Sequence, residues 1–400
     1  MELECTMDEQ DVIVLDNGSG YLKVGFCGED APRAVLPTVV ATTTVDEAEK
    51  DGHDVNVDSA ASAKKSQAFY GDEALLQQNA TVTRPVRRGS VVMEPMTKDA
   101  LESLWEHTFR NVLGVEQEEL PVLIADAQPL GQSAYPSRQW TAEIMFEKLK
   151  VKSLAIFNTA VLSLFSTGKT RGLVVESGEG ITQAVPVFEG YAIPHAIFKM
   201  EVAGQDITSK VQGMMKRDFG EEQAGSIRVM QALKEKVCRV ERDYSSAMKG
   251  PDNDDEEAKS FELPDGTVIQ VKKEIRAGAP EVLFGAGDPS APSMQKICNE
   301  AITTCDLDFR QDLVKSLVVA GGTSMLPGLA PRLRSELANT LPPELARQVD
   351  VLVDSQRRYA AWIGGSMFAS LSTFNQVAIT KPEYEEGKAD TRSLVARKTF

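Results

Sequence analysis

Residues 12–20 read Val-Ile-Val-Leu-Asp-Asn-Gly-Ser-Gly, and a second apolar run, Tyr21 to Phe26, follows them. An apolar run ending in an acid, a Gly-x-Gly turn and another apolar run together predict a β-hairpin. Glycine is expected at such a turn because the turn needs positive φ. Taken alone, Asn17-Gly18 is typical of an ordinary hairpin turn and implies no ligand.

The same plan recurs in the second half of the chain. Residues 173–180 read Leu-Val-Val-Glu-Ser-Gly-Glu-Gly, and the apolar run Ile181 to Phe188 follows. One such hairpin in each half predicts a duplicated domain. The length of 400 residues also favours two lobes, because a single hydrophobic core stops growing near about 250–300 residues.

Other segments predict helices, turns and loops. Helical spacing is expected over residues 136–150, 155–166 and 329–337, and a helix from Met367 to Phe374 is expected after the turn Gly364-Gly365-Ser366. Residues 249–257 are rich in acids and predict a solvated loop. Residues 41–66 combine small residues with acids and predict a long mobile excursion.

Composition limits the classes of partner. The chain has 43 Lys and Arg against 59 Asp and Glu, a net charge of −16, so it repels nucleic acid and acidic lipid in bulk. Five scattered cysteines without a C-x-x-C pair are typical of reduced thiols in the cytosol or nucleus. No signal peptide or membrane span is recognisable, so we expect a soluble intracellular protein that contacts neither membrane nor nucleic acid directly.

Two facing hairpins would clamp a polyphosphate. Backbone N–H groups at a turn of small residues converge on an anion, and the hydroxyls of Ser19 and Ser177 add donors. Asp16 and Glu176 end the two strands, where carboxylates can reach Mg²⁺ or its water ligands. Lys23 is placed to neutralise phosphate charge.

A third glycine turn could contact the nucleoside of a bound nucleotide. Gly321-Gly322 follows a predicted strand and would let a nucleoside approach the backbone, although such a pair alone is more often a strand-to-helix turn. No H-E-x-x-H, G-x-S-x-G or Walker pattern offers another chemistry. The conjunction of two alike hairpins with further glycine turns therefore favours a nucleotide site.

Many segments occur in the order found in actin and the actin-related proteins, and the chain resembles this family from about Val12 to Phe400. The matching segments are Leu15-Asp-Asn-Gly-Ser-Gly20, Gly25-Phe26, Asp30-Ala-Pro-Arg-Ala34, Tyr70-Gly-Asp-Glu-Ala74, Ile144-Met-Phe-Glu147, Ala160-Val-Leu-Ser-Leu164, Tyr191-Ala-Ile-Pro-His-Ala-Ile197, Leu263-Pro-Asp-Gly266, Trp362-Ile-Gly-Gly-Ser366 and Ala369-Ser-Leu-Ser-Thr-Phe374. The ending, Tyr384-Glu-Glu-Gly387 with Arg397-Lys-Thr-Phe400, is similar to centractin.

The resemblance implies an α/β, actin-like two-lobed fold of duplicated ribonuclease-H-like domains with a nucleotide cleft between them. The outer lobe would comprise residues 1–158 and 360–400, with 41–68 as its mobile acidic excursion. The inner lobe would comprise residues 159–359, with about 202–292 as its peripheral subdomain.

The resemblance also implies the ligand, ATP or ADP with Mg²⁺, bound weakly or as a structural ligand. Asp16 and Glu176 fall on the metal positions, and Arg358 stands where actin has a lysine. The nucleotide-binding residues would be Gly18, Ser19, Gly20, Lys23, Ser177, Gly178, Glu179, Gly180, Gly204, Lys234, Glu235, Gly321, Gly322, Met325, Arg358 and Tyr359.

The positions that carry hydrolysis in the family are replaced. Thr159 stands for the glutamine that positions the attacking water, and Gln183 for the histidine that helps to order it. Glu176 and Glu179 stand for aspartates, and an extra methylene at Glu176 should disturb the water shell of Mg²⁺. We therefore expect nucleotide to be bound and hydrolysed very slowly or not at all.

Filament contacts of the family are also altered. Residues 41–66 are acidic where actin has an apolar-tipped loop, and residues 285–292 have no large apolar side chain where actin has its hydrophobic plug. The loop Arg87-Arg88-Gly89 is basic where actin carries a modified histidine. Each change removes apolar area from a filament contact, so long filaments are not expected.

One apolar cleft of the family is kept and would receive amphipathic helices of partners. Its residues would be Phe165, Gly168, Thr170, Tyr191, Met367, Phe368, Leu371 and Thr373. For Met367, Phe368 and Leu371 the alternative is simply the buried face of a helix.

Three functions follow from the resemblance. The chain would be a non-polymerising cytoskeletal or complex subunit that docks actin-binding-type proteins, a multiprotein complex or actin itself. The alternatives are an ATP-hydrolysing, filament-forming actin and a subunit of a nuclear chromatin complex. The expected compartment is the cytoplasm and its cytoskeleton, or the nucleus.

Overall fold

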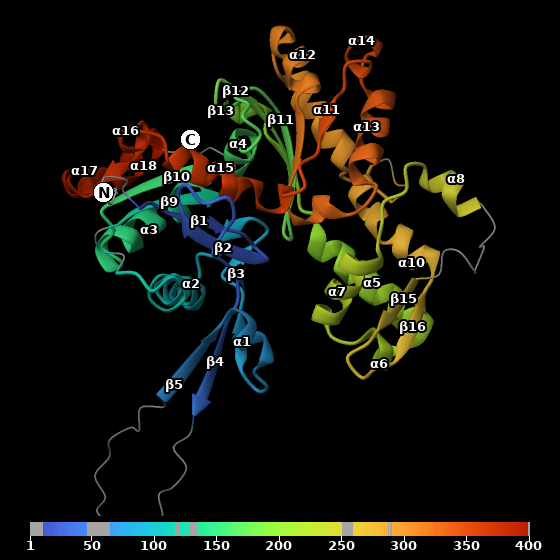
Figure 1. Cartoon of the computed structure of the whole chain (residues 1–400), viewed down its shortest axis with the longest axis horizontal. Coiled ribbons are helices and arrows are strands. Elements are labelled where there is room, and N and C mark those ends of the chain that lie inside the picture. Colours follow the sequence, from blue (N-terminus) through green and yellow to red (C-terminus); the bar gives the residue numbers. More distant parts are fainter. Residues whose placement is uncertain are drawn as a thin grey trace, which may run out of the picture.

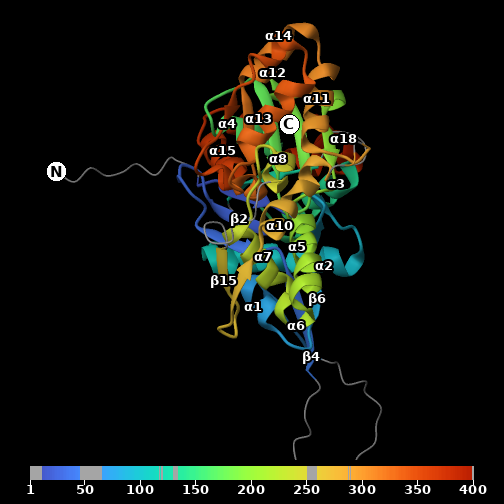
Figure 2. The ribbon, with the colours of Figure 1, turned by 90° about the vertical axis from the view of Figure 1, so that its right-hand side faces the viewer.

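The computed structural model describes residues 11–45, 65–116, 118, 120–128, 134–249, 259–286, 288 and 290–398. Two lobes lie side by side, each built on one mixed β-sheet with helices on both faces (Figure 1). Turned by 90°, one lobe lies behind the other, so the molecule is a flattened body (Figure 2). No helix within these described ranges has both the length and the apolar character needed to cross a membrane.

The sheet of the first lobe has the order β19-β10-β9-β1-β2-β3. Its strands are β1 (Ile13–Asn17), β2 (Tyr21–Phe26), β3 (Ala34–Pro37), β9 (Pro121–Asp126), β10 (Ser153–Asn158) and β19 (Ile379–Thr380). The first three residues of β1, Ile13, Val14 and Leu15, are all apolar because both faces of the strand are covered there. Ile13 and Leu15 pack in one core, and Val14 packs in the core on the opposite face.

Helices on the two faces of this sheet supply the rest of those cores. One core receives α2, α3 and α18, and the other receives α4, α15 and α16. The bounds of these helices are α2 (Pro95–His107), α3 (Tyr135–Glu143, continued by a π-helix over Ile144–Lys148), α4 (Thr159–Phe165), α15 (Ala360–Ala369), α16 (Phe374–Val377) and α18 (Thr391–Arg397).

The sheet of the second lobe has the order β13-β12-β11-β17-β18, and β14 also pairs with β12. Its strands are β11 (Gly172–Ser177), β12 (Thr182–Phe188), β13 (Tyr191–Ala192), β14 (Phe198–Met200), β17 (Leu317–Ala320) and β18 (Val351–Leu352). Leu173 and Val175 face a core shared with α11, α12 and α13, whereas Val174 faces α4. Helix α4 therefore packs between the two sheets.

The two sheets repeat one arrangement. Strand β1 pairs antiparallel with β2 and parallel with β9, and β11 pairs antiparallel with β12 and parallel with β17. Asp16 lies opposite Lys23 in the first hairpin, and Glu176 lies opposite Gln183 in the second. The predictions of duplicated hairpins and of a two-lobed α/β fold are confirmed.

Each lobe carries a peripheral region (Figure 1). In the first lobe it contains β4 (Val40–Val45), β5 (Lys65–Tyr70), α1 (Gly71–Leu76), β6 (Thr81–Thr83) and the hairpin β7 (Val86–Arg87)–β8 (Ser90–Val91). In the second lobe it contains α5 (Gly204–Phe219), α6 (Glu221–Ala224), α7 (Ile227–Val237), α8 (Tyr244–Lys249), β15 (Lys259–Glu262), β16 (Val268–Val271) and α10 (Lys273–Gly278). The remaining helices are α11 (Met294–Thr304), α12 (Leu307–Lys315), α13 (Leu329–Thr340), α14 (Pro343–Ala346) and α17 (Lys381–Glu386).

Two predicted segments lie wholly or partly outside the described residues, and one of them needs correction. The mobile excursion predicted over residues 41–68 begins and ends in strands, because 41–45 and 65–68 pair in β4 and β5. Residues 42–45 read Thr-Thr-Thr-Val, and such β-branched residues favour strands. Residues 46–64 lie outside the described residues, as does nearly all of the predicted acidic loop at 249–257.

Two predictions of local structure were wrong. The helix predicted over residues 155–166 is strand β10 up to Asn158 and becomes helix α4 only from Thr159, because a buried strand and a buried helix are equally apolar. Gly364 and Gly365 lie inside helix α15 instead of forming a turn before it, and the helix predicted from Met367 to Phe374 ends at Ala369, with α16 beginning at Phe374. The predicted helices at 136–150 and 329–337 are confirmed by α3 with its π-helical continuation and by α13.

The close packing of α15 on α4 explains these glycines. A Cβ atom at Gly364 would lie 1.7 Å from the backbone oxygen of Leu162, far inside van der Waals contact. The carbonyl belongs to the helix backbone and cannot swing away as a side chain can. Glycine is therefore needed at position 364 for the two helices to meet between the sheets.

We expect Gly364→Ala to lower the free energy of unfolding by about 1–3 kcal/mol or more, since overpacking forces the backbone apart. Gly213→Ala is the matched control, because nothing lies within 4 Å of a Cβ atom at this position in α5. The control should be neutral or more stable by roughly 0.5–1 kcal/mol. Urea unfolding measures both, and equal stability of the two variants would contradict the packing argument.

Candidate functional site

The two hairpins meet across one cavity between the lobes. The cavity has a volume of about 280 Å³ and is lined by both turns, including Ser19 and Gly180. A Cβ atom at Gly20 would lie 2.8 Å from Cβ of Glu179, and one at Gly180 would lie 2.7 Å from Oγ of Ser19. The volume is close to the lower end of small-molecule sites, about 300–1,000 Å³.

Close contacts, and not backbone angles, explain three of the four turn glycines, Gly18, Gly20 and Gly180. Gly18, Gly20, Gly178 and Gly180 all lie outside the positive-φ region, contrary to the prediction that the turns need positive φ. At Gly18 a Cβ atom would lie 2.7 Å from the oxygen of Tyr21. Side chains at Gly18, Gly20 or Gly180 would push the hairpin strands or the two lobes apart, whereas a Cβ atom at Gly178 would lie 3.9 Å from the oxygen of Ile181, an ordinary contact.

Four carbonyl groups of the two turns, those of Gly18, Gly20, Gly178 and Glu179, accept hydrogen bonds from within their own lobes. Thr38 donates from Oγ1 to the oxygen of Gly18 at 2.7 Å and from its amide to Gly20 at 3.0 Å. The first amides of α5 donate to the oxygens of Gly178 at 3.0 Å and Glu179 at 2.9 Å. Carbonyl oxygens repel phosphate, so their occupation elsewhere suits loops that present amides to an anion.

The two strand-end carboxylates lie at the base of the cavity with different partners. Asp16 accepts from Nζ of Lys23 at 2.6 Å. Glu176 Oε2 accepts from Oγ1 of Thr159 at 2.5 Å and from Nε2 of Gln183 at 2.8 Å. Burial raises the pKa of Glu176, the two hydrogen bonds oppose that rise, and the Asp16 charge adds to it.

The other end of the cavity is formed by the second lobe. Lys234 donates from Nζ to the oxygen of Gly204 at 3.0 Å and lies 3.6 Å from Glu179. Arg358 and Glu235 form an exposed ion pair at 3.8 Å on the cavity wall. Gly321 has a φ of 90° and lies so close to the second hairpin that a Cβ atom would be 2.3 Å from the oxygen of Ser177.

The cavity brings together most of the residues predicted to bind nucleotide and both predicted metal ligands. Those that line it are Asp16, Gly18, Ser19, Gly20, Lys23, Glu176, Gly178, Glu179, Gly180, Lys234, Glu235, Gly321, Gly322, Met325, Arg358 and Tyr359. Carboxylate oxygens are the protein ligands that suit Mg²⁺, so Asp16 and Glu176 fit a magnesium ion at the phosphate end.

Two of the residues predicted to bind nucleotide, Ser177 and Gly204, do not line the cavity. Ser177 is fully buried and does not line the cavity, because its hydroxyl pairs with Oγ1 of Thr182 at 2.9 Å across the hairpin. That Ser177 donates to a phosphate stays a prediction. Gly204 lies behind the second turn, where its carbonyl accepts from Lys234. A strand alternates its side chains between faces, and Ser177 takes the inner one.

The structure adds residues that the sequence interpretation missed. Tyr21, Gly89, Gln231, Thr323 and Arg357 all line the cavity. Thr323 donates from Oγ1 to the oxygen of Gly178 at 2.7 Å, which fixes the second turn from below. Gly89 belongs to the hairpin β7–β8, in which the dipeptide Arg88-Gly89 forms the turn between Val86-Arg87 and Ser90-Val91.

The predicted partner cleft comes from the end of α4, from β13 and from α15. Tyr191, Leu371 and Met367 are 61%, 54% and 47% exposed, and Gly168, Thr170 and Thr373 are also exposed. Phe368 stacks on Phe165 with ring centroids 5.7 Å apart, so these two rings are partly core residues. That the surface binds a partner stays a prediction.

Comparison with models of known protein families matches residues 7–400 to the family described as Actin. The match extends over both hairpins, both sheets and every residue that lines the cavity.

The buried carboxyl of Glu176 predicts a pH-dependent stability. Folding raises the pKa of this carboxyl. Below the ordinary value of 4.5 the carboxyl is therefore neutral in both the folded and the unfolded protein, and it does not lower the free energy of unfolding. As the pH rises through the folded-state pKa, the charged form is disfavoured in the folded protein and stability falls. Gln at this position keeps an acceptor oxygen for Thr159 and Gln183 without the charge.

We therefore expect Glu176→Gln to unfold at a higher temperature than the wild type at pH 8, in protein freed of nucleotide and metal. The difference should shrink as the pH is lowered toward 4.5. The exposed Glu344→Gln controls for one lost charge in a chain of net charge −16. A difference of the same size at every pH would refute the burial argument.

Proposed function

The chain belongs to the actin family, and from this premise we propose that it is an actin-related protein that binds nucleotide but hydrolyses it very slowly or not at all. ATP or ADP with Mg²⁺ is its ligand. It acts as a cytoskeletal or complex subunit that docks partner proteins, in the cytoplasm or the nucleus, and does not form long filaments.

The bonding of Glu176 carries this proposal. Thr159 and Gln183 both donate to the same carboxylate oxygen, Oε2. Both donor groups are therefore engaged by Glu176, and on this proposal they do not orient an attacking water. Phosphoryl transfer depends on positioning and electrostatics, so loss of a water-orienting group costs orders of magnitude in rate.

Binding has separate support. The turns around Gly20 and Gly180 meet as closely as backbone allows, and their carbonyls are occupied elsewhere. Lys23 supplies positive charge from the wall of the same cavity. When bound, Mg²⁺ would neutralise phosphate charge and would be held by Asp16 and Glu176, directly or through water. Apart from the magnesium site, which includes Glu176, these features do not depend on the positions that are replaced for hydrolysis.

Docking is supported by exposed apolar side chains. Tyr191 lies in β13, Met367 lies in α15 and Leu371 follows the end of α15, and all three side chains are exposed. An apolar surface beside two helices suits the apolar face of an amphipathic helix. The proposal that the chain does not form long filaments rests on the sequence, which has many acids in residues 41–66 and no large apolar residue in residues 285–292.

The first test compares ligand binding with turnover. We expect ATP with Mg²⁺ to raise the unfolding temperature, because a ligand of the folded state stabilises it by mass action. Phosphate release should stay far below that of filamentous actin assayed alongside, and the protein should remain in the supernatant on sedimentation. Turnover equal to that of actin would reject the hydrolysis claim, and no thermal shift would reject nucleotide binding.

The second test restores the water-orienting groups. We expect the double variant Thr159→Gln, Gln183→His to raise phosphate release at saturating ATP by about tenfold or more, as expected for regained positioning. Thr159→Ser is the control, because it keeps a hydroxyl that can donate to Glu176. If the double variant binds ATP as the wild type does and gains no turnover, the bonding of Glu176 is not what limits hydrolysis.

A further inference from the structure

The hairpin β7–β8 turns through Arg88 and Gly89, which have φ values of 49° and 71°. A two-residue turn with both φ values positive is the tight hairpin turn for which Asn-Gly or Gly-Gly is preferred. A long side chain at its first position is strained. Such strain persists only where the surrounding contacts hold it, and it is a reason to look for a function.

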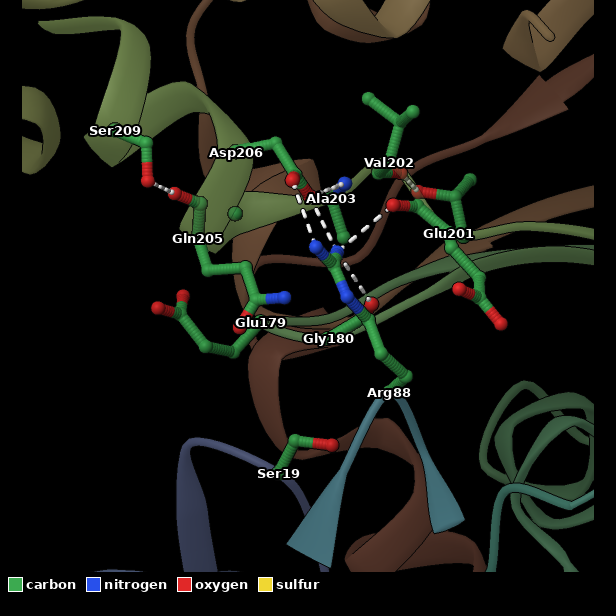
Figure 3. A network of polar contacts seen from close by, with 12 residues as sticks. Ser19, Arg88, Glu179, Gly180, Glu201, Val202, Ala203, Gln205, Asp206 and Ser209 are labelled. Carbon is green, nitrogen blue, oxygen red and sulfur yellow. Dashed lines mark hydrogen bonds and ion pairs between the residues drawn. The ribbon is translucent and has the colours of Figure 1, made fainter. Parts of the chain in front are cut away.

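The contacts that hold Arg88 all lie in the other lobe (Figure 3). Its Nη1 donates to Oδ2 of Asp206 at 2.6 Å, and Nη2 donates to Oδ1 at 2.9 Å. Nη1 also donates to the backbone oxygens of Glu201 at 2.8 Å and Gly180 at 3.2 Å. A paired guanidinium and carboxylate in this two-bond geometry form a strong and directional contact.

Asp206 is itself held in place. It lies in the first turn of α5, and its Oδ2 accepts from the amide of Ala203 at 2.9 Å. The side chains of Arg88 and Asp206 are only 34% and 27% exposed to solvent. The ion pair therefore joins two fixed backbones and is partly shielded from water.

Among the described residues, two other side-chain hydrogen bonds cross between the lobes, and both are weaker. Arg228 pairs with Asp72 at 3.0 Å, and Gln231 donates to the hydroxyl of Tyr21 at 3.2 Å. Both lie at exposed side chains and each consists of one bond, and exposed pairs of this kind contribute little.

The same turn reaches the first phosphate loop. The amide of Gly89 donates to Oγ of Ser19 at 2.9 Å, so the hydroxyl keeps its own proton for another acceptor. A Cβ atom at Gly89 would lie 2.6 Å from Cδ1 of Ile181, beside the second turn. One residue pair, Arg88-Gly89, thus contacts both hairpins and the helix behind them.

We propose that Arg88 is a positioning residue whose ion pair with Asp206 latches the two lobes at the spacing of the phosphate loops, while Gly89 orients the Ser19 hydroxyl. The latch slows the escape of bound nucleotide. This consequence rests on the proposed nucleotide binding, but the latch exists without ligand. The sequence interpretation placed Arg88 in a filament contact, whereas the structure directs its side chain into the molecule.

The test breaks the ion pair from either side. Arg88→Asn removes the guanidinium and suits the turn, because Asn tolerates positive φ. Asp206→Asn removes the charge but keeps an oxygen for the amide of Ala203. Arg87→Asn is the matched control, because Arg87 lies in the same hairpin and bonds locally, from Nε to the oxygen of Arg84 at 3.2 Å.

Two measurements are made on the full chain. Hydrogen exchange of residues 18–20 and 88–90 is followed without nucleotide, and release of a fluorescent ATP analogue is followed with Mg²⁺. We expect Asp206→Asn to speed exchange in these first-lobe segments, although the change is in the second lobe, and to speed release by about tenfold, as for loss of a partly buried ion pair. The double variant with Arg88→Asn should be no faster than either single variant.

If Asp206→Asn matches Arg87→Asn in both measurements, the latch is refuted. If the wild type binds no nucleotide, the proposed function fails, and hydrogen exchange alone decides the latch. Exchange of the core strand β9 reports global unfolding, so a rise confined to the turns supports the latch and an equal rise in β9 overturns it.

Discussion

The structure depends on how closely two glycine turns approach each other. There is no room for a Cβ atom at Gly20 against Glu179, or at Gly180 against Ser19. Because each turn joins the two strands of a hairpin in its own sheet, this contact sets how closely the two sheets approach each other at the cavity. The cavity, its basic and acidic walls and the distance between its carboxylates all follow from that approach.

Binding a nucleotide and hydrolysing it require different groups in such a cleft. Binding a polyphosphate needs backbone amides, positive charge and a matching shape, which the turns and Lys23 provide. Hydrolysis also needs a polar group that holds one water in line with the bond to be broken. Thr159 and Gln183 instead bond to Glu176. On the proposed function, the chain retains the first property without the second, as suits a nucleotide that holds two lobes together.

The fold was largely predictable because its signals are local. Each hairpin is marked in the sequence by an apolar run that ends in an acid, Asp16 or Glu176. The recurrence of this pattern predicted the duplicated domain. Features set by packing between distant segments were missed. Gly364 looks like a turn glycine, but its role depends on the carbonyl of Leu162 about two hundred residues earlier.

The candidate site shows the same division. Residues next to the turns were found from the pattern, whereas the inward face of Ser177 depends on strand register and the contacts of Arg88 depend on the other lobe. A run of basic residues in a sequence is most simply taken as a solvated surface. Only the meeting of β7–β8 with α5 shows that one of these side chains is a bridge.

The most direct test of the central claim is a structure of the protein determined with ATP and Mg²⁺ present. The account predicts phosphates between residues 18–20 and 178–180, contacted by amides of both turns, with Mg²⁺ beside Asp16 and Glu176. Phosphates bound to one lobe only, or nucleotide bound outside this cavity, would contradict it.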